Sequence, residues 1–285
     1  MAISTVLKNW INCNVMNKLN LKVETLTIDR LEEQRINALY NADHFEKAIF
    51  PVPSSILKSN PEPIFQSLAE SKLNRSKLQR SELNDVGYTY KNDFYTSPDA
   101  DVLYAIVSSY KPNIFMEVGS GNSTKITRQA IKDYQLSTQI WSIDPQPRAE
   151  IDVLCDKVLR LPVERLEFNS FLELSSGDIL FIDSSHKVMT GNDVTFLFLN
   201  VLPSLPSGII LHIHDIFLPF EYPKHFIDEK RNWNEQYLVQ AILDFSDSFE
   251  VLWAGHFLQK THQGFHNHFE NISDGTAQSL WLRKI

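Results

Sequence analysis

Two short segments of the chain combine acidic side chains with histidines directly after apolar runs of strand length. The first, GDILFIDSSHKV, has Asp183 and His186 three positions apart. The second, GIILHIHDIF, contains His212, His214 and Asp215. A carboxylate and an imidazole so placed could be a metal ligand and a general base, because the unperturbed pKa of histidine lies near neutral pH. They could also be the polar residues of a turn.

The segment HIHD allows a second chemical interpretation, a zinc hydrolase site, because H-x-H followed by an acid can bind zinc. Hydrolase motifs of this kind usually carry a further histidine directly after the acid, whereas Ile216 and Phe217 follow here. His212 lies within an apolar run and is expected to be a core histidine. A polar surface loop is the expected location of three more histidines, His262, His266 and His268.

Seven apolar runs could supply the strands that position these side chains. They lie at residues 114–118, 139–143, 156–161, 178–182, 208–213, 249–257 and 278–284. Between the first five runs lie segments long enough for helices, such as 124–134 and 193–201. Buried strands that alternate with helices predict a doubly wound α/β domain with a mostly parallel sheet. Such sheets bind ligands at the carboxyl ends of their strands, which is where Asp183 and Asp215 would lie.

The turn after the first predicted strand, EVGSGNST, indicates a ligand site. Gly119 and Gly121 would let the backbone approach a ligand closely. The dinucleotide fingerprint G-x-G-x-x-G fails, because Thr124 stands where the third glycine belongs. Glu117 would repel a pyrophosphate but suits a cationic amino group. Asp144, at the end of the second strand, could accept hydrogen bonds from a ribose diol.

A nucleoside with a cationic amino-acid tail describes S-adenosylmethionine. On these residues, the segment 96–285 resembles the class I S-adenosylmethionine-dependent methyltransferases. The resemblance implies a Rossmann-like sheet of seven strands, whose last strand inserts antiparallel between the two before it. Ser123 stands where many members have a third glycine. The cofactor-binding residues that the resemblance implies are Glu117, Gly119, Ser120, Gly121, Ser123, Asp144 and Asp183.

The segments DSSH and HIHD also resemble two branches of this superfamily. One is a small-molecule branch with a D-x-x-H turn and a later strand ending in H-D, and the other contains the metal-dependent, catechol-type O-methyltransferases. The second resemblance implies that Asp183 and Asp215 bind a divalent metal, magnesium or manganese, and that His186 deprotonates an acceptor hydroxyl. The catechol-type pattern has asparagine where this chain has Ile216. His214 could be the third ligand, although imidazole is softer than the oxygen ligands that magnesium prefers.

The long segment after the fifth strand, FLPFEYPKHFIDEKRNWNEQYL, is predicted to be a lid or specificity element ahead of a helix from about Asn234. Its end matches the W-x-E-Q-Y helix start of the small-molecule branch at Trp233, Glu235, Gln236 and Tyr237. Tyr222, Trp233 and Tyr237 could form an aromatic wall of the site or pack in the core. The aromatic residues before the first strand are predicted to cover the cofactor: Tyr88, Tyr90, Phe94 and Tyr95.

Composition narrows the function classes. The formal net charge of the 285-residue chain is −8, which argues against a nucleic-acid partner. The two cysteines form no C-x-x-C motif, so we expect no disulfide framework and a cytoplasmic location. No stretch approaches the roughly 18 apolar residues of a membrane span.

Residues 1–95 are predicted to be a mainly helical cap or docking element, and residues 96–285 the cofactor-binding methyltransferase domain. The apolar residues of the first 21 positions recur at helical spacing, and could pack on the protein's own body or dock to a membrane or partner. The sequence does not fix the oligomeric state, and a homo-oligomer is possible. The expected function is methyl transfer to a hydroxyl oxygen of a small-molecule acceptor. The alternatives are a nucleotide-dependent oxidoreductase and a non-catalytic cofactor-binding partner protein.

Overall fold

The structure of the chain is a computed structural model that describes residues 5–78, 86–147, 150–270 and 275–285. It divides into two compact units, Met1–Lys47 and Ala48–Ile285. No helix among the described residues is long and apolar enough to cross a membrane.

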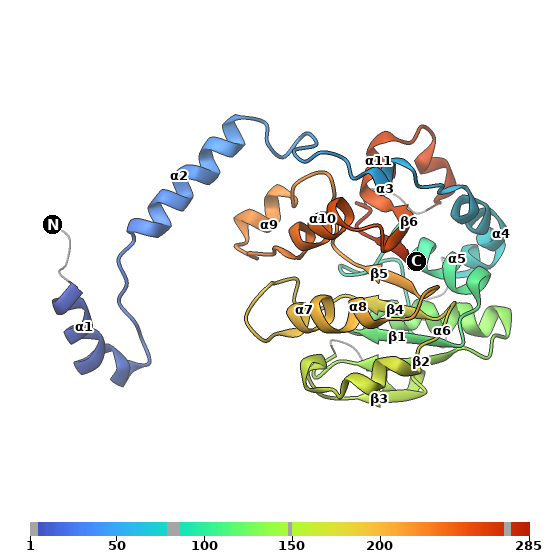
Figure 1. Cartoon of the computed structure of the whole chain (residues 1–285), viewed down its shortest axis with the longest axis horizontal. Coiled ribbons are helices and arrows are strands. Elements are labelled where there is room, and N and C mark those ends of the chain that lie inside the picture. The colour runs from blue at the N-terminus through green and yellow to red at the C-terminus, as the bar shows by residue number, and fades with distance from the viewer. Residues whose placement is uncertain (1–4, 79–85, 148–149, 271–274) are drawn as a thin grey trace. The chain divides into compact units, whose positions relative to one another are not determined.

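The first unit consists of the helices α1 (Thr5–Asn14) and α2 (Thr27–Asn41) and a short 3-10 helix, η1 (Met16–Leu19) (Figure 1). None of its described residues is buried, and Trp10 is 58% exposed. This unit therefore builds no core from the residues described. The docking role expected of the N-terminal region stays a prediction.

The second unit contains a sheet of seven strands in the order β3-β2-β1-β4-β5-β7-β6. Its strands are β1 (Ile114–Val118), β2 (Gln139–Ile143), β3 (Lys157–Leu159), β4 (Ile179–Ile182), β5 (Ile210–Ile213), β6 (Phe249–Ala254) and β7 (Leu280–Lys284). Strand β7 runs antiparallel to both of its neighbours and the other pairs are parallel. The predicted doubly wound, seven-stranded sheet with an antiparallel last strand is confirmed.

The register of the sheet aligns the carboxyl ends of its central strands. Val118 of β1 lies opposite Ile143 of β2 and Ile182 of β4, and Ile182 lies opposite Ile213 of β5. Because these strands end at one level, the polar residues that follow each of them emerge at the same edge of the sheet.

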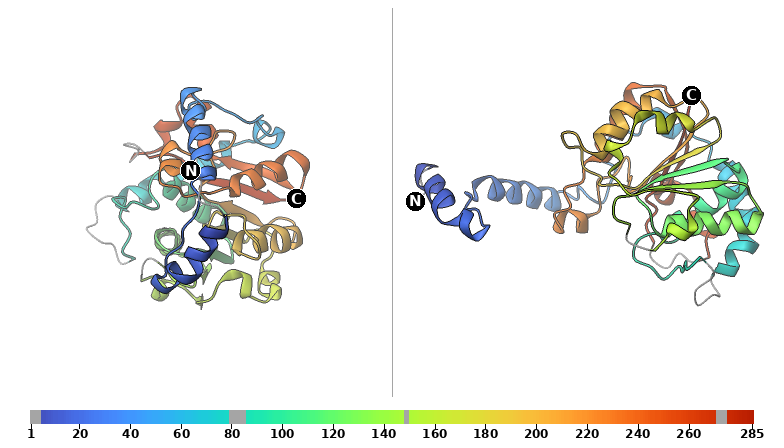
Figure 2. Two further views of the ribbon diagram at one scale, coloured as in Figure 1. Left: turned by 90° about the vertical axis from the view of Figure 1, so that its left-hand side faces the viewer. Right: turned by 90° about the horizontal axis from the view of Figure 1, so that it is seen from below.

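Helices cover both faces of the sheet (Figure 2, right). One face carries α4 (Glu62–Leu78), α5 (Asp99–Tyr110), α6 (Asn122–Tyr134) and α11 (Gly255–Thr261). The other carries α3 (Ser54–Leu57), α7 (Asp193–Phe196), the π-helix η5 (Leu197–Val201), α8 (Leu202–Ser204) and α10 (Glu235–Phe245). Successive strand residues point to opposite faces and enter different cores, as Phe115 and Met116 do. Both faces are therefore apolar, which explains the continuous apolar runs of the sequence.

Several connections differ from the predictions. The segments that join β2, β3 and β4 contain, in their described parts, only the 3-10 helices η2 (Asp152–Leu154), η3 (Val163–Arg165) and η4 (Phe168–Glu173). Pro145, Pro147 and Pro162 lie in these segments and cannot donate a backbone hydrogen bond to a continuous helix. The last two connections contain α9 (Lys224–Asp228) and η6 (Phe265–His268).

The strand predicted over 249–257 ends at Ala254, because Gly255 begins α11. The region predicted as a polar surface loop is partly buried: Phe265 is fully buried. The rings of His262 and His268 lie 4.7 and 4.2 Å from that of Phe65 on α4. These histidines therefore cover an apolar helix face, which the local sequence could not reveal.

Candidate active site

A large cavity opens at the carboxyl ends of β1, β2, β4 and β5. Its volume is about 1320 Å³, which exceeds the roughly 300–1,000 Å³ of an ordinary small-molecule pocket. It therefore has room for a nucleoside cofactor and a second small ligand. The turn after β1, the residues that follow β2, β4 and β5, and the segment around α9 line it.

The turn after β1 is packed directly against the backbone after β4. Gly119 has a positive φ of 83°, and a Cβ atom at this position would lie 1.8 Å from the carbonyl oxygen of Asp183. Only glycine fits such an approach. Gly121, by contrast, faces open space, because a Cβ atom there would meet nothing within 4 Å. Gly119, Ser120, Gly121 and Ser123 all line the cavity.

Asp144 lies at the cavity wall beside this glycine turn. Its Oδ2 accepts a hydrogen bond from the backbone N–H of Ser120 at 2.9 Å, and its Oδ1 accepts one from the N–H of Gln146 at 2.7 Å. The two bonds fix the carboxylate at the end of β2, where a ribose diol could donate to its remaining lone pairs.

Glu117 lies beneath the glycine turn and does not line the cavity. It is fully buried, and its two carboxyl oxygens accept hydrogen bonds from the hydroxyls of Ser123 and Thr124. Burial raises the pKa of Glu117 to about 8, although the two hydroxyl hydrogen bonds oppose this shift. Direct contact with a ligand's amino group would require the carboxyl group to leave these two partners.

The raised pKa of Glu117 predicts a pH-dependent stability. Between pH 4.5 and about 8, the unfolded chain loses this proton while the folded protein keeps it. The free energy of unfolding should therefore fall as the pH rises through this window, by an amount on the order of a few kcal/mol. In urea unfolding of the cofactor-free protein, Glu117→Gln should show a shallower fall between pH 5 and pH 8 than the wild type. Glu250→Gln, at an exposed position, is the control, and equal slopes for Glu117→Gln and wild type would contradict the assignment.

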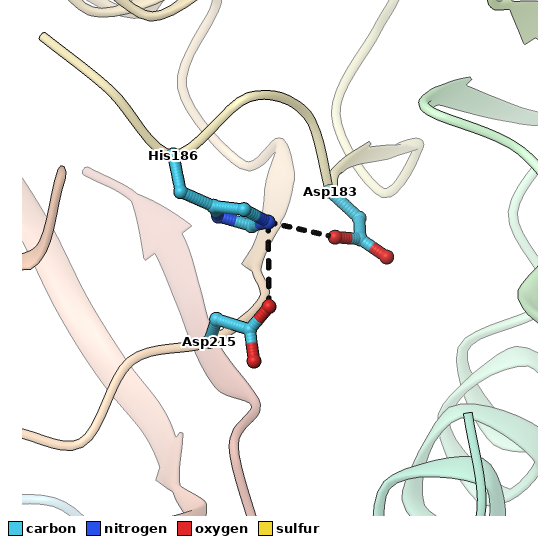
Figure 3. A group of neighbouring side chains, drawn as sticks. All are labelled: Asp183, His186 and Asp215. Carbon is cyan, nitrogen blue, oxygen red and sulfur yellow. Dashed lines mark hydrogen bonds and ion pairs between the residues drawn. The ribbon is translucent and has the colours of Figure 1, made fainter. Parts of the chain in front are cut away.

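His186 is held between three carboxylates (Figure 3 shows two of them). Its Nδ1 lies 2.9 Å from Oε2 of Glu235, and its Nε2 lies 3.1 Å from Oδ1 of Asp183 and 3.3 Å from Oδ2 of Asp215. The carbonyl oxygen of His186 accepts hydrogen bonds from the N–H groups of Asn234 and Glu235. The turn after β4 is thereby fixed to the start of α10, and the imidazole is fixed at its Nδ1 side.

The partner Glu235 was not predicted as a site residue. The sequence showed it only as part of the helix start WNEQY. Glu235 is fully buried, and its Oε1 has no hydrogen-bond partner among the described residues. An acid at the start of a helix is common for electrostatic reasons alone, so the sequence carried no signal that this one is buried against His186, 49 positions away.

The predicted aromatic wall is built by one of its three residues. Trp233 lines the cavity, and its ring centroid lies 4.2 Å from that of His186. Tyr222 is buried, and its hydroxyl accepts a hydrogen bond from the N–H of Gln236, so it packs in the core. Tyr237 is 40% exposed and does not line the cavity. Of the predicted aromatic cover, the cavity-lining residues are Phe94 and Tyr95.

His214 is buried beside the same carboxylates. Its Nδ1 lies 3.5 Å from Oδ2 of Asp215 and 3.7 Å from Oδ1 of Asp183, and its Nε2 lies 3.5 Å from Oδ2 of Asp99. His212 is a core histidine, as expected: its ring stacks on that of Phe181 at 3.9 Å. Burial, reinforced by the charge of His214, holds the pKa of His212 well below its usual value.

The carboxylates determine the charge of the two site histidines. Burial by itself would lower the pKa of His186, but hydrogen bonds to Asp183 and Glu235 and the charge of Asp215 raise this pKa to about 10. Burial likewise opposes charging of His214, but Asp215 and Asp183 raise its pKa well above the usual value. Burial would raise the pKa of Asp183, yet the charge of His214 and the hydrogen bond and charge of His186 hold it well below its usual range. The carboxylates thus favour the protonated form of both imidazoles.

The same side chains could hold a metal ion. Donor atoms of Asp183, His186 and Asp215 all lie within 4.8 Å of one another. Adjacent ligands of an octahedral ion with bonds of about 2.1 Å are roughly 3.0 Å apart, close to the 3.1 and 3.3 Å from the imidazole Nε2 to the two carboxylates. A shared proton and a divalent cation therefore both fit this arrangement.

The strand order, the antiparallel β7 and the glycine turn at the end of β1 form the Rossmann-like fold of the class I S-adenosylmethionine-dependent methyltransferases. Residues 116–216 match a family described as a methyltransferase domain. The matched segment runs from β1 to just past β5, and contains both the glycine turn and the His186 cluster.

Comparison with curated proteins gives no match. Among solved structures, the chain is similar to an SAH-bound methyltransferase of Podospora anserina, at 13% identity and a TM-score of 0.43, covering 92% of this chain and 99% of that one. It is also similar to an O-methyltransferase from Bacillus cereus in complex with SAH, at 11% identity and a TM-score of 0.41, covering 81% and 94%.

Proposed function

We propose that this methyltransferase transfers the methyl group of S-adenosylmethionine to a hydroxyl oxygen of a small-molecule acceptor, with His186 as the proton acceptor. The observation that carries this proposal is the buried pair of Glu235 and His186. A carboxylate bound to Nδ1 fixes the tautomer and orientation of an imidazole, and leaves Nε2 for chemistry. In this pair Nε2 is the nitrogen beside Asp183 and Asp215, at the wall of the cavity.

In the proposed reaction, the bond between the methyl carbon and the sulfonium sulfur breaks as the bond to the acceptor oxygen forms. The hydroxyl proton passes to Nε2 of the neutral form of His186, and S-adenosylhomocysteine leaves. Because the neighbouring carboxylates raise the pKa of His186 to about 10, this step requires that bound ligands first relieve the contact of Nε2 with Asp183 and Asp215. Such an in-line displacement depends on alignment of the two reactants, for which Asp183 and Asp215 are well situated. Asp144 would hold the ribose of the cofactor, and the turn of Gly119 and Gly121 would contact its methionine part.

Asp183 and Asp215 are also the proposed ligands of a divalent cation, magnesium or manganese, with His214 as a third ligand. Such a cation would lower the pKa of a bound hydroxyl. A cation on the two carboxylates would replace the proton that they now hold on Nε2 of His186. Nε2 is itself one of the three donor atoms close enough to bind such an ion, and a bound nitrogen has no lone pair for the acceptor proton. The base role of His186 therefore requires that the cation be held without Nε2.

The first test is binding and turnover with and without a chelator. Calorimetry should detect S-adenosylmethionine but not NAD, which separates the methyltransferase from the oxidoreductase alternative. With a panel of hydroxylated acceptors, formation of S-adenosylhomocysteine should fall roughly tenfold or more after EDTA treatment and recover with Mg²⁺ or Mn²⁺. Asp183→Asn and Asp215→Asn should abolish the recovery.

The outcomes separate the parts of the proposal. Indifference to EDTA would remove the metal and leave methyl transfer standing. Failure to bind S-adenosylmethionine would overturn the proposed function. Binding without turnover of any acceptor would favour the non-catalytic partner protein.

A further inference from the structure

Both acidic and basic side chains line the cavity. Acidic ones follow β2 and β3, as Asp144 and Glu164 do, and also β4 and β5, as Asp183, Asp193 and Asp215 do. The basic ones all lie beyond β4 and β5: Lys187, His225, Lys230 and Arg231. Among the described residues, no lysine or arginine outside this set lines the cavity. We call these four residues the basic wall.

Arg231 has the geometry of an anion clamp. Its Nε donates to Oε2 of Glu229 at 2.7 Å, and its Cζ lies 3.8 Å from the ring centroid of Phe226 and 4.9 Å from that of Trp233. Stacking and the Nε bond restrict the plane of the guanidinium group. Its two Nη groups have no hydrogen-bond partner among the described residues. A guanidinium edge of this kind matches the two oxygens of a carboxylate or phosphate.

The backbone before Arg231 is held by the end of α9. The N–H of Arg231 donates to the carbonyl of Phe226 at 3.0 Å, and that of Lys230 donates to the carbonyl of Ile227 at 2.9 Å. These two bonds form a Schellman cap, in which Lys230 is the left-handed residue, with a φ of 54°. The cap fixes the backbone of Arg231 directly after the helix.

Trp233 connects the clamp to the proposed base. Its ring lies 4.9 Å from the guanidinium carbon of Arg231 and 4.2 Å from the ring of His186. Trp233 thus separates the place where Arg231 would bind an anionic group from the place where His186 would meet a hydroxyl. A small molecule lying along this ring could carry both groups.

We propose that the methyl acceptor carries an anionic group, a carboxylate or a phosphate, that is bound by the basic wall with Arg231 as its bidentate anchor. This inference rests on the proposed function, because His186 is what assigns the acceptor hydroxyl to this part of the cavity. The basic wall then selects an anionic acceptor.

The test uses matched phenolic ligands that differ only in charge. Calorimetry on the protein loaded with S-adenosylhomocysteine would compare 3,4-dihydroxybenzoate with its amide, and 3,4-dihydroxybenzylphosphonate with its neutral diethyl ester. The anionic member of a pair should bind about tenfold more tightly or better. Whichever anion shows the larger preference, carboxylate or phosphonate, identifies the chemistry that the clamp recognises.

Variants show whether Arg231 is responsible. Arg231→Gln should remove the preference for the anion, and Arg231→Lys should restore part of it, because lysine keeps the charge but lacks the planar fork. Arg283→Gln is the matched control, since Arg283 is 37% exposed and pairs with Glu250 much as Arg231, at 33%, pairs with Glu229. This control should leave the preference unchanged.

Three binding results would overturn the inference: equal binding within each pair, no binding by any of the four ligands, or an undiminished preference in Arg231→Gln. Turnover distinguishes this inference from the proposed function. Anion-dependent binding without methylation of any hydroxylated compound would overturn the proposed function alone. Methylation of neutral acceptors as fast as of their anionic counterparts would overturn this inference alone.

Discussion

Replacement of His186 by asparagine is expected to lower kcat by about 100- to 10,000-fold, while S-adenosylmethionine still binds. The proposed reaction needs a group that takes the hydroxyl proton, and Nε2 of His186 is the atom oriented for this by Glu235. Asparagine cannot take up that proton. Because the loss concerns a transition-state interaction, kcat and kcat/KM should fall together.

His256→Asn is the matched control for this experiment. His256 is also buried, and its Nδ1 contacts the carbonyl of Ala277 rather than a carboxylate. It does not line the cavity. This variant should keep the kcat of the wild type. Full activity in His186→Asn would show that another group, such as Asp183 or Asp215, accepts the proton.

Replacement of Gly119 by alanine should destabilise the protein by about 3 kcal/mol or more and abolish cofactor binding. The added Cβ atom would lie 1.8 Å from the carbonyl oxygen of Asp183. This neighbour is backbone, and the N–H of Asp183 is itself bonded to the carbonyl of Val118, so the turn after β1 and the end of β4 must separate. Thermal or urea unfolding gives the stability, and calorimetry gives the loss of cofactor binding.

Gly191→Ala separates this collision from ordinary backbone strain. Gly191 also has a positive φ, of 69°, but a Cβ atom there would meet nothing within 4 Å. Gly191→Ala should therefore lower the free energy of unfolding by only about 1–2 kcal/mol, because alanine is unfavourable in a left-handed conformation. If the two variants were equally stable, the turn after β1 would not be in close contact with Asp183, and the proposed cofactor site would lose its geometric basis.

The fold could be predicted well because its signals are local. The runs at β1, β2, β4 and β5 are apolar on both faces, which is the pattern of strands buried between two helix layers. The antiparallel β7 was predicted from the resemblance to the class I methyltransferases, and that resemblance was based on Glu117, the glycines and Asp144. The 3-10 helices around β3 could not be predicted, because short proline-containing connections are determined by the packing they must fit.

The sequence by itself determined which side chains follow the ends of the central strands. In a parallel sheet this is enough to bring Asp183, His186, His214 and Asp215 to one edge. Only the tertiary structure decided what each of them faces. Glu235 reaches His186 from a helix 49 positions away, and Arg231 stacks on Trp233 at the same cavity. Such contacts depend on how a long connection folds back over the sheet, and strand and helix periodicity carries no information about that path.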